Sequence, residues 1–161
     1  MGMTAFEPAV LALADALRAR GWKIATAESC TGGMIAAACT AVAGSSDWFE
    51  RGFVTYSNEA KAESLGVPMA LIQAHGAVSE QVARSMAEGA LTHSRAELAV
   101  AVTGIAGPGG GSRDKPVGTV WLALAVRAGD VRAELLTLGG DRTAVREQTV
   151  QHALRRLLEN A

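Results

Sequence analysis

The sequence has few of the residues that bind metals or form disulfides. Its two cysteines, Cys30 and Cys39, do not have the spacing of a metal site, and its three histidines, His75, His93 and His152, are scattered along the chain. We therefore expect no zinc centre, and nothing in the sequence calls for another metal or an organic cofactor. So few cysteines are typical of a reduced protein, and we expect a cytoplasmic location.

Strong net charge and long hydrophobic runs are also missing. The formal net charge is −1 at pH 7, whereas a general nucleic-acid binder carries a basic stripe, so we expect no nucleic-acid partner. No apolar run reaches the ~18 residues that span a bilayer. The first residues, MGMTAFEPAV, lack the basic and then apolar pattern of a signal peptide, so we expect no membrane partner.

The chain has enough apolar residues to form a sizeable core. Hydrophobic residues make up 49% of its 161 residues, and we expect one domain over 1–161. Apolar periodicity and capping residues predict helices over 8–20, 32–43, 58–65, 80–95 and 142–159, with a short helix or turn over 68–76. Strands are predicted over 22–27, 52–57, 98–103, 118–127 and 131–138, with loops over 44–52 and 104–118. Helices and strands that alternate and end in a hairpin predict an α/β fold, a three-layer α/β/α sandwich with a mixed sheet.

The stretch AESCTGG, residues 27–33, lies in a turn between a predicted strand and a predicted helix. Ligands of open α/β sheets sit beyond such strand ends. The residues leave three interpretations open. Ser29 could be a nucleophile, the backbone amides of residues 30–33 (Cys30, Thr31, Gly32 and Gly33) could hold an anion, or Ser29 or Thr31 could simply cap the helix. Cys30 is a rival nucleophile, because a helix N-terminus activates a thiolate.

Lys61 lies in the stretch YSNEAKAESLG, near the start of a short predicted helix. If Asn58 is the N-cap, Lys61 is the third helical residue, where the helix dipole disfavours a cation. A lysine that acts as a general base needs a pKa of about 7–8 instead of ~10.4, and burial must contribute to such a shift. No Ser–His–Asp set is visible, so a Ser29–Lys61 pair is the natural way to activate Ser29. The alternative is a solvated lysine.

Two further segments could contribute to a site. The loop over 104–118 is rich in glycine but lacks the G-K-[ST] of a phosphate-binding loop, so we expect a lid or a backbone cradle. Arg142 and Arg146 share one face of the last helix near its start, where they could bind an anion or be plain surface residues. Tyr56, the only tyrosine, could relay a proton, stack on a ring, or pack across the sheet.

Five stretches together resemble the C-terminal domain of the competence/damage-inducible protein CinA, whose stand-alone versions are nicotinamide-nucleotide amidases of the PncC type. These are AESCTGG, AGSSDWFERGFVTYSNEAK, HGAVSE, TGIAGPGGGSRDKPVGTVW and GDRTAVR, and the resemblance runs from about residue 11 to 158. It implies an α/β/α fold and a homodimer or higher homo-oligomer. It also implies hydrolysis of nicotinamide mononucleotide to nicotinic acid mononucleotide and ammonia, in pyridine-nucleotide salvage. The molybdopterin-binding-like domain of longer members has no counterpart in these 161 residues.

The resemblance also implies roles for two residues: Ser29 would be the nucleophile and Lys61 its partner. For an amidase of this kind, we expect the amides of residues 30–33 to form the oxyanion site. We expect Arg142 and Arg146, or the loop over 107–111, to bind the 5′-phosphate. Further candidates near the reacting group are Tyr56, Thr103, Gly104 and Gly107.

Two other functions remain open. A non-catalytic nucleotide-binding or regulatory module would use the same residues as a cradle, and a phosphoryl-transfer enzyme is disfavoured because no carboxylate pair for magnesium is visible. Glu28 could offset the positive pyridinium ring or cap a turn.

Overall fold

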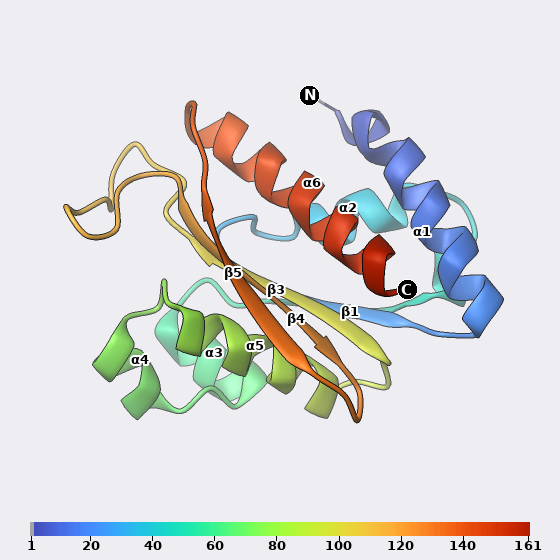
Figure 1. Cartoon of the computed structure of the whole chain (residues 1–161), viewed down its shortest axis with the longest axis horizontal. Helices are drawn as coiled ribbons and strands as arrows, with labels where there is room; N and C mark the ends of the chain where they lie inside the picture. The colour runs from blue at the N-terminus through green and yellow to red at the C-terminus, as the bar shows by residue number, and fades with distance from the viewer. Residues whose placement is uncertain (1) are drawn as a thin grey trace.

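A five-stranded mixed sheet forms the middle layer of the structure, a computed structural model that describes residues 2–161 (Figure 1). Its strands, in spatial order, are β2 (Phe49–Val54), β1 (Ile24–Glu28), β3 (Leu98–Gly104), β4 (Thr119–Val126) and β5 (Val131–Thr137). The first three are parallel to one another, and β4 and β5 are antiparallel to their neighbours. The predicted mixed sheet and its closing hairpin are confirmed.

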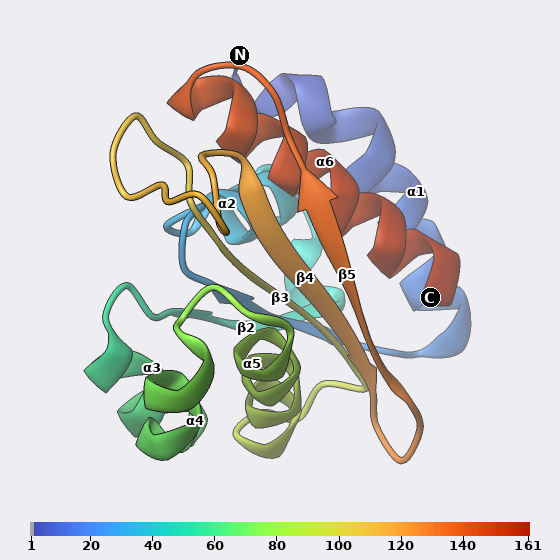
Figure 2. The same ribbon diagram turned by 60° about the vertical axis from the view of Figure 1, so that its left-hand side comes forward.

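Helices cover both faces of this sheet, as Figures 1 and 2 show. One layer holds α1 (Glu7–Arg20), α2 (Met34–Thr40) and α6 (Arg142–Asn160), with the short 3₁₀ turns η1 (Met3–Phe6) and η2 (Ser45–Asp47). The opposite layer holds α3 (Asn58–Leu65), α4 (Met69–His75) and α5 (Glu80–Thr92). The predicted three-layer arrangement is therefore confirmed. None of the helices within residues 2–161 combines the length and apolar character that crossing a membrane requires.

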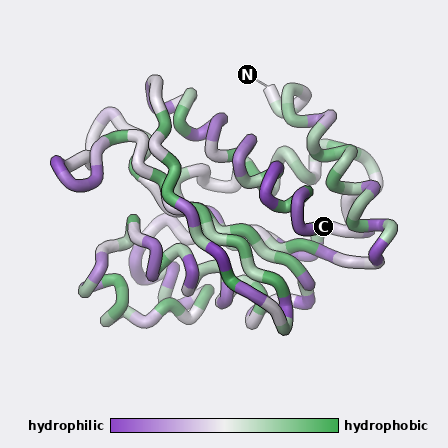
Figure 3. The backbone as a smooth tube through the Cα atoms, in the orientation of Figure 1, coloured by the Kyte–Doolittle hydropathy of each residue, from purple (hydrophilic) through white to green (hydrophobic). Residues whose placement is uncertain are grey.

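The central strands are buried on both faces, and the two faces differ in side-chain size. Large residues such as Ile24, Leu98 and Leu122 pack toward α1 and α6. Alanines of β1, β3 and β4 cover the opposite face, beneath α5: Ala25, Ala27, Ala99, Ala101, Ala123 and Ala125. Small side chains let α5 pack close to the sheet, and the strands form the apolar centre visible in Figure 3.

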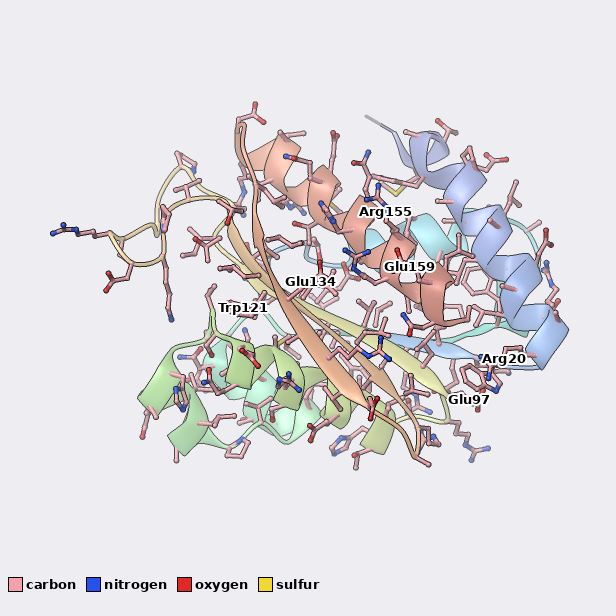
Figure 4. The ribbon with its side chains drawn as sticks, in the orientation of Figure 1. Arg20, Glu97, Trp121, Glu134, Arg155 and Glu159 are labelled. Atoms are coloured by element: carbon pink, nitrogen blue, oxygen red, sulfur yellow. The ribbon has the colours of Figure 1, made fainter. Side chains whose placement is uncertain are left out.

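A hydrogen bond links α6 to β5: Glu134 of β5 accepts it from the Nη2 of Arg156 in α6, over 3.0 Å. On the other face of the sheet, Trp121 of β4 packs in the core between the sheet and α5. Figure 4 labels Glu134 and Trp121. The hydrogen bond between Glu134 and Arg156 and the apolar face of α6 hold the helix against the sheet.

Two predicted boundaries near the candidate turn are wrong. The helix predicted over 32–43 begins only at Met34, because residues 29–33 form turns and Gly33, with φ 105°, is its N-cap. The segment predicted as a loop over 44–52 contains the η2 turn and the first residues of β2. Trp48, between them, is fully buried. Burial of Trp48 and pairing with β1 outweigh the polar residues that suggested a loop.

The helix that carries Lys61 has the predicted bounds but a different cap. Ser57, not Asn58, is the N-cap of α3, and its hydroxyl accepts a 3.0 Å hydrogen bond from the amide of Ala60. Lys61 is therefore the fourth helical residue instead of the third.

Candidate active site

Ser29 lies directly after β1, at the edge of the sheet where the parallel strands end. Its amide donates to Val102 O of β3 over 3.1 Å, so the serine is held in register with the neighbouring strand. The side chain is half-buried and borders a cavity of about 230 Å³. The other residues around this cavity are Cys30, Tyr56, Gly104, Ile105, Ala106, Gly107, Gly109, Gly110 and Arg142.

Lys61 reaches this serine from α3, in the helical layer that also holds α4 and α5. Its Nζ lies 3.0 Å from Ser29 Oγ and 3.0 Å from the carbonyl oxygen of Thr55. The residue is only 2% exposed, and this burial lowers the pKa of the Lys61 amine, while the nearby Cys30 acts in the opposite direction. The physical requirement for a lysine base, a buried amine beside a hydroxyl, is therefore met.

Cys30 does not have the environment of a reactive thiol. Its side chain is 6% exposed, and burial raises the pKa of the thiol to about 11, although the backbone amide of Cys30 and the guanidinium of Arg146 act in the opposite direction. The thiol is protonated near neutral pH, so Cys30 is not the nucleophile that this turn offers.

Glu28 provides the cap of α2. This fully buried carboxylate accepts hydrogen bonds from the Thr31 hydroxyl (2.5 Å) and from the amides of Ile35 (2.8 Å) and Ala36 (3.0 Å). It thus satisfies amides at the start of the helix and complements the helix dipole there. Neither Ser29 nor Thr31 caps this helix, because its N-cap residue is Gly33 and Glu28 accepts the hydrogen bonds of the Ile35 and Ala36 amides. The interpretation of Ser29 as a simple cap is wrong, and its hydroxyl stays available to Lys61.

The backbone amides of residues 30–33 are not equivalent. The Gly32 amide donates to Ser29 O over 3.0 Å, which closes the turn and removes this amide from the set expected to face an anion. Within residues 2–161, the amides of Cys30, Thr31 and Gly33 donate to no other residue. A bound anion could therefore accept hydrogen bonds from them.

Arg142 connects the glycine-rich loop to the segment before α3. Its Nη1 donates to Gly107 O over 2.8 Å, and its Nη2 donates to the hydroxyl of Tyr56 over 3.0 Å. Tyr56 is 62% exposed, so it is not the cross-strand packing residue that one interpretation expected.

Arg142, like Ala106, borders two cavities. It borders the small cavity at Ser29 and a larger one of about 460 Å³ at the start of α6. The other residues around the larger cavity are Ala106, Pro108, Val117, Gly140, Asp141 and Thr143. A ligand that fills both cavities would pass the guanidinium of Arg142.

Arg146 does not share this position, although it lies one turn further along α6. Its Nε donates to Cys30 O over 3.2 Å and its Nη2 to Thr31 O over 3.1 Å. The sequence places both arginines on one face of the helix and leaves open which of them meets an anion. Arg142 borders both cavities, whereas Arg146 is bonded to the backbone behind the turn.

The remaining candidates come from the end of β3 and the loop after it. The Thr103 hydroxyl donates to Ala77 O over 2.9 Å and is 1% exposed, so it holds the segment before α5 against the sheet. Gly104 and Gly107 border the small cavity through their backbone. The loop over 104–118 projects beyond the sheet in both views (Figures 1 and 2). It is tied back by Arg142 at Gly107 and by Lys115, whose Nζ donates to His75 O over 2.9 Å.

Sequence reasoning missed the contributions of backbone carbonyls. Thr55 O receives the Lys61 amine and Gly107 O receives Arg142. Every residue has a backbone carbonyl, so the residue types in a sequence do not indicate which carbonyl accepts such a bond, and only the fold reveals these contacts. No three His, Cys, Asp or Glu side chains gather as metal ligands would in the described part of the chain.

Comparison with known proteins gives one consistent family. The model of the CinA C-terminal domain matches residues 7–161. The chain is 56% identical over 143 residues to the nicotinamide-nucleotide amidohydrolase PncC of Escherichia coli K12, covering 89% of this chain and 87% of that protein. It is 54% identical over 149 residues to the protein of the same name from Enterobacter agglomerans, covering 90% and 91%.

Among solved structures, the crystal structure of the competence/damage inducible protein CihA from Agrobacterium tumefaciens superposes with a TM-score of 0.94. The two chains are 49% identical, and the match covers 99% of this chain and 96% of that one. With this agreement in sequence and fold, the chain belongs to the CinA C-terminal domain family.

Proposed function

We propose that this chain is a nicotinamide-nucleotide amidase, which hydrolyses the carboxamide of nicotinamide mononucleotide to nicotinic acid mononucleotide and ammonia. The observation that carries the proposal is the buried Lys61 amine 3.0 Å from the Ser29 hydroxyl, at the edge of a cavity. Relatives that are 54% and 56% identical over most of their length are named nicotinamide-nucleotide amidohydrolases, which supports this substrate and a role in pyridine-nucleotide salvage.

The first step is activation of the serine. The uncharged Lys61 amine has two N–H bonds and one lone pair. If one N–H donates to Thr55 O, the lone pair can accept the proton of Ser29 Oγ. The Thr55 carbonyl thus orients the base, and it also stabilises the ammonium that forms. Ser29 Oγ then bonds to the carboxamide carbon, and the carbonyl electron pair moves onto oxygen.

The oxyanion is stabilised by the turn that carries the nucleophile. The amides of Cys30, Thr31 and Gly33 are the donors that remain there. Each such donor contributes roughly 2.7–4 kcal/mol to the transition state in serine hydrolases. Collapse of the intermediate breaks the C–N bond, and protonated Lys61 gives its proton to the leaving nitrogen, which departs as ammonia.

Hydrolysis of the acyl-enzyme completes the cycle. Water attacks the ester of Ser29 while Lys61 accepts one of its protons. The second intermediate then releases the carboxylic acid, while protonated Lys61 returns its proton to Ser29 Oγ. The acid ionises and the released ammonia takes up its proton, so atoms and charge balance with water as the only other reactant.

Arg142 is the residue that we assign to the 5′-phosphate. Its guanidinium borders both cavities and is held there by hydrogen bonds to Gly107 O and Tyr56 OH, which supports this assignment. Hydrogen bonds between arginine and phosphate are strong because both groups are charged. Glu28 does not take the role of offsetting the pyridinium ring in this mechanism, because its carboxylate is fully buried and receives three hydrogen bonds.

The test is release of ammonia from nicotinamide mononucleotide, with the nucleotide product followed by chromatography. We expect equal amounts of ammonia and nicotinic acid mononucleotide. Binding without turnover would instead identify a non-catalytic nucleotide-binding module and would refute the proposal.

Two properties accompany this function. We propose a homodimer or higher homo-oligomer, as the family resemblance implies, and light scattering measures it directly. We also propose a cytoplasmic location, because phosphorylated nucleotides do not cross membranes unaided.

A further inference from the structure

Arg146 joins the last helix to the turn that carries Ser29. Its Nε and Nη2 donate to the carbonyl oxygens of Cys30 and Thr31, at 3.2 and 3.1 Å, across 116 and 115 residues of sequence. The side chain is half-buried. The planar guanidinium presents donors in a fixed arrangement, so two bonds to consecutive carbonyls hold that backbone more firmly than a lysine could.

Fixing these carbonyls also fixes the amides behind them. In a trans peptide the C=O of one residue and the N–H of the next belong to one plane and point in opposite directions. A bond to Cys30 O therefore sets the direction of the Thr31 amide, and a bond to Thr31 O sets that of the Gly32 amide. The Gly32 amide closes the turn onto Ser29 O, and the Thr31 amide has no protein acceptor within residues 2–161.

The charge of Arg146 also acts on this turn. It lowers the pKa of the Cys30 thiol, although burial outweighs it and the pKa is raised overall. A negative charge that develops beside Cys30 is thus stabilised by the guanidinium. The amide oxygen of a substrate becomes negative in the same region when Ser29 attacks it.

We propose that Arg146 is a positioning residue, which holds the Ser29–Gly33 turn so that its free amides meet the oxyanion. It acts on turnover and not on substrate binding. This role rests on the proposed Ser29 mechanism, and it separates Arg146 from Arg142, which borders both cavities.

The experiment compares Arg146→Ala with Arg142→Ala in steady-state assays on nicotinamide mononucleotide. We expect Arg146→Ala to lower kcat by about 10²-fold, the scale of losing one oxyanion donor, with little change in KM. Arg142→Ala should mainly raise KM. Added guanidinium ion, far below denaturing concentrations, should restore part of the kcat of Arg146→Ala, a rescue that a loss of general stability would not show.

Several results would overturn the proposal. An Arg146→Ala enzyme with a raised KM and an unchanged kcat would make Arg146 a substrate ligand, and unchanged kinetics would leave it without a role. If Arg146→Ala does not fold, Arg146→Lys replaces it, because it keeps the charge without the fork of donors. A lysine enzyme with wild-type kcat would then contradict the proposal. The wild type is assayed first, since a wild type without amidase activity refutes the proposed function itself.

Discussion

The amine of Lys61 lies 3.0 Å from the hydroxyl of Ser29, although 32 residues separate the two in sequence. The serine follows β1 and the lysine is the fourth residue of α3, so the contact joins the sheet to one helical layer. Burial removes water from the charged amine and lowers the pKa of Lys61, which shifts the equilibrium toward the uncharged form. The pair therefore brings a base and a nucleophile together without histidine.

The pH dependence of catalysis should report the Lys61 amine. Burial lowers the pKa of Lys61 from the usual 10.5, and only the uncharged amine can accept the proton of Ser29. We expect kcat/KM to rise with pH along a titration curve whose midpoint is below 10.5, and to level off above that midpoint. The measurement is kcat/KM for nicotinamide mononucleotide over a range of pH. A rate that falls across this range would show that the charged amine is the active form.

The same amine should lower the stability of the fold. The folded pKa of Lys61 is below the unfolded value, so between the two values the unfolded chain binds more protons and stability rises with pH. We expect Lys61→Met to melt at a higher temperature than the wild type at pH 7, with a difference that shrinks toward pH 10, and to be inactive.

A control for this prediction is Lys23→Met, because the side chain of Lys23 is exposed. It should change stability by no more than about 0.5 kcal/mol. If Lys61→Met melts below the wild type at pH 7, the buried amine stabilises the fold and the expected direction of the change is wrong.

Substitution of Arg142 should affect only substrates that carry a phosphate. A hydrogen bond to a charged group contributes about 1.5–3 kcal/mol, so Arg142→Ala should raise KM for nicotinamide mononucleotide roughly 10- to 100-fold. Nicotinamide riboside, which lacks the phosphate, should be hydrolysed equally by both enzymes. Arg113→Ala, in the exposed part of the loop, is the matched control. An equal loss on both substrates would assign Arg142 to the pyridine or ribose instead.

Gly89 should not tolerate a methyl group, despite its place in a helix. Replacing glycine by alanine within a helix usually stabilises by up to ~1 kcal/mol. Here a Cβ would lie 2.0 Å from the carbonyl oxygen of Leu65, at the contact of α5 with α3. We expect Gly89→Ala to destabilise by about 1–3 kcal/mol in urea unfolding. Gly139→Ala meets no atom within 4 Å and should be near neutral. A more stable Gly89→Ala protein would mean that α5 can shift at no cost.

The sequence predicted the parts of the site that local patterns determine. Apolar periodicity placed a strand before Ser29 and a short helix around Lys61, and the absence of a Ser–His–Asp set suggested their contact. The contact forms because Ser29 follows β1 and the helix with Lys61 follows β2, and these parallel strands end at the same edge of the sheet. Capping was harder to assign, since Ser57 and Asn58 are both good caps and Glu28 reaches α2 from a strand.

Other contacts depend on backbone atoms or on the assembled sheet. Arg146 binds carbonyl oxygens, and the spacing of two arginines gives no sign of this. The early start of β2 was hidden because Glu50 and Arg51 are charged, and an edge strand tolerates charge on its exposed side. Such features are determined by neighbours that are distant in sequence.

The most direct test of the Ser–Lys mechanism is ammonia release by Ser29→Ala. The small change should leave the fold intact, because the amide of Ser29 still bonds to Val102. We expect kcat to fall by at least about 10³-fold, with nicotinamide mononucleotide still bound and an unchanged circular dichroism spectrum. Turnover at the wild-type rate by this folded variant would contradict the mechanism, since the amide would then be cleaved without the Ser29 hydroxyl.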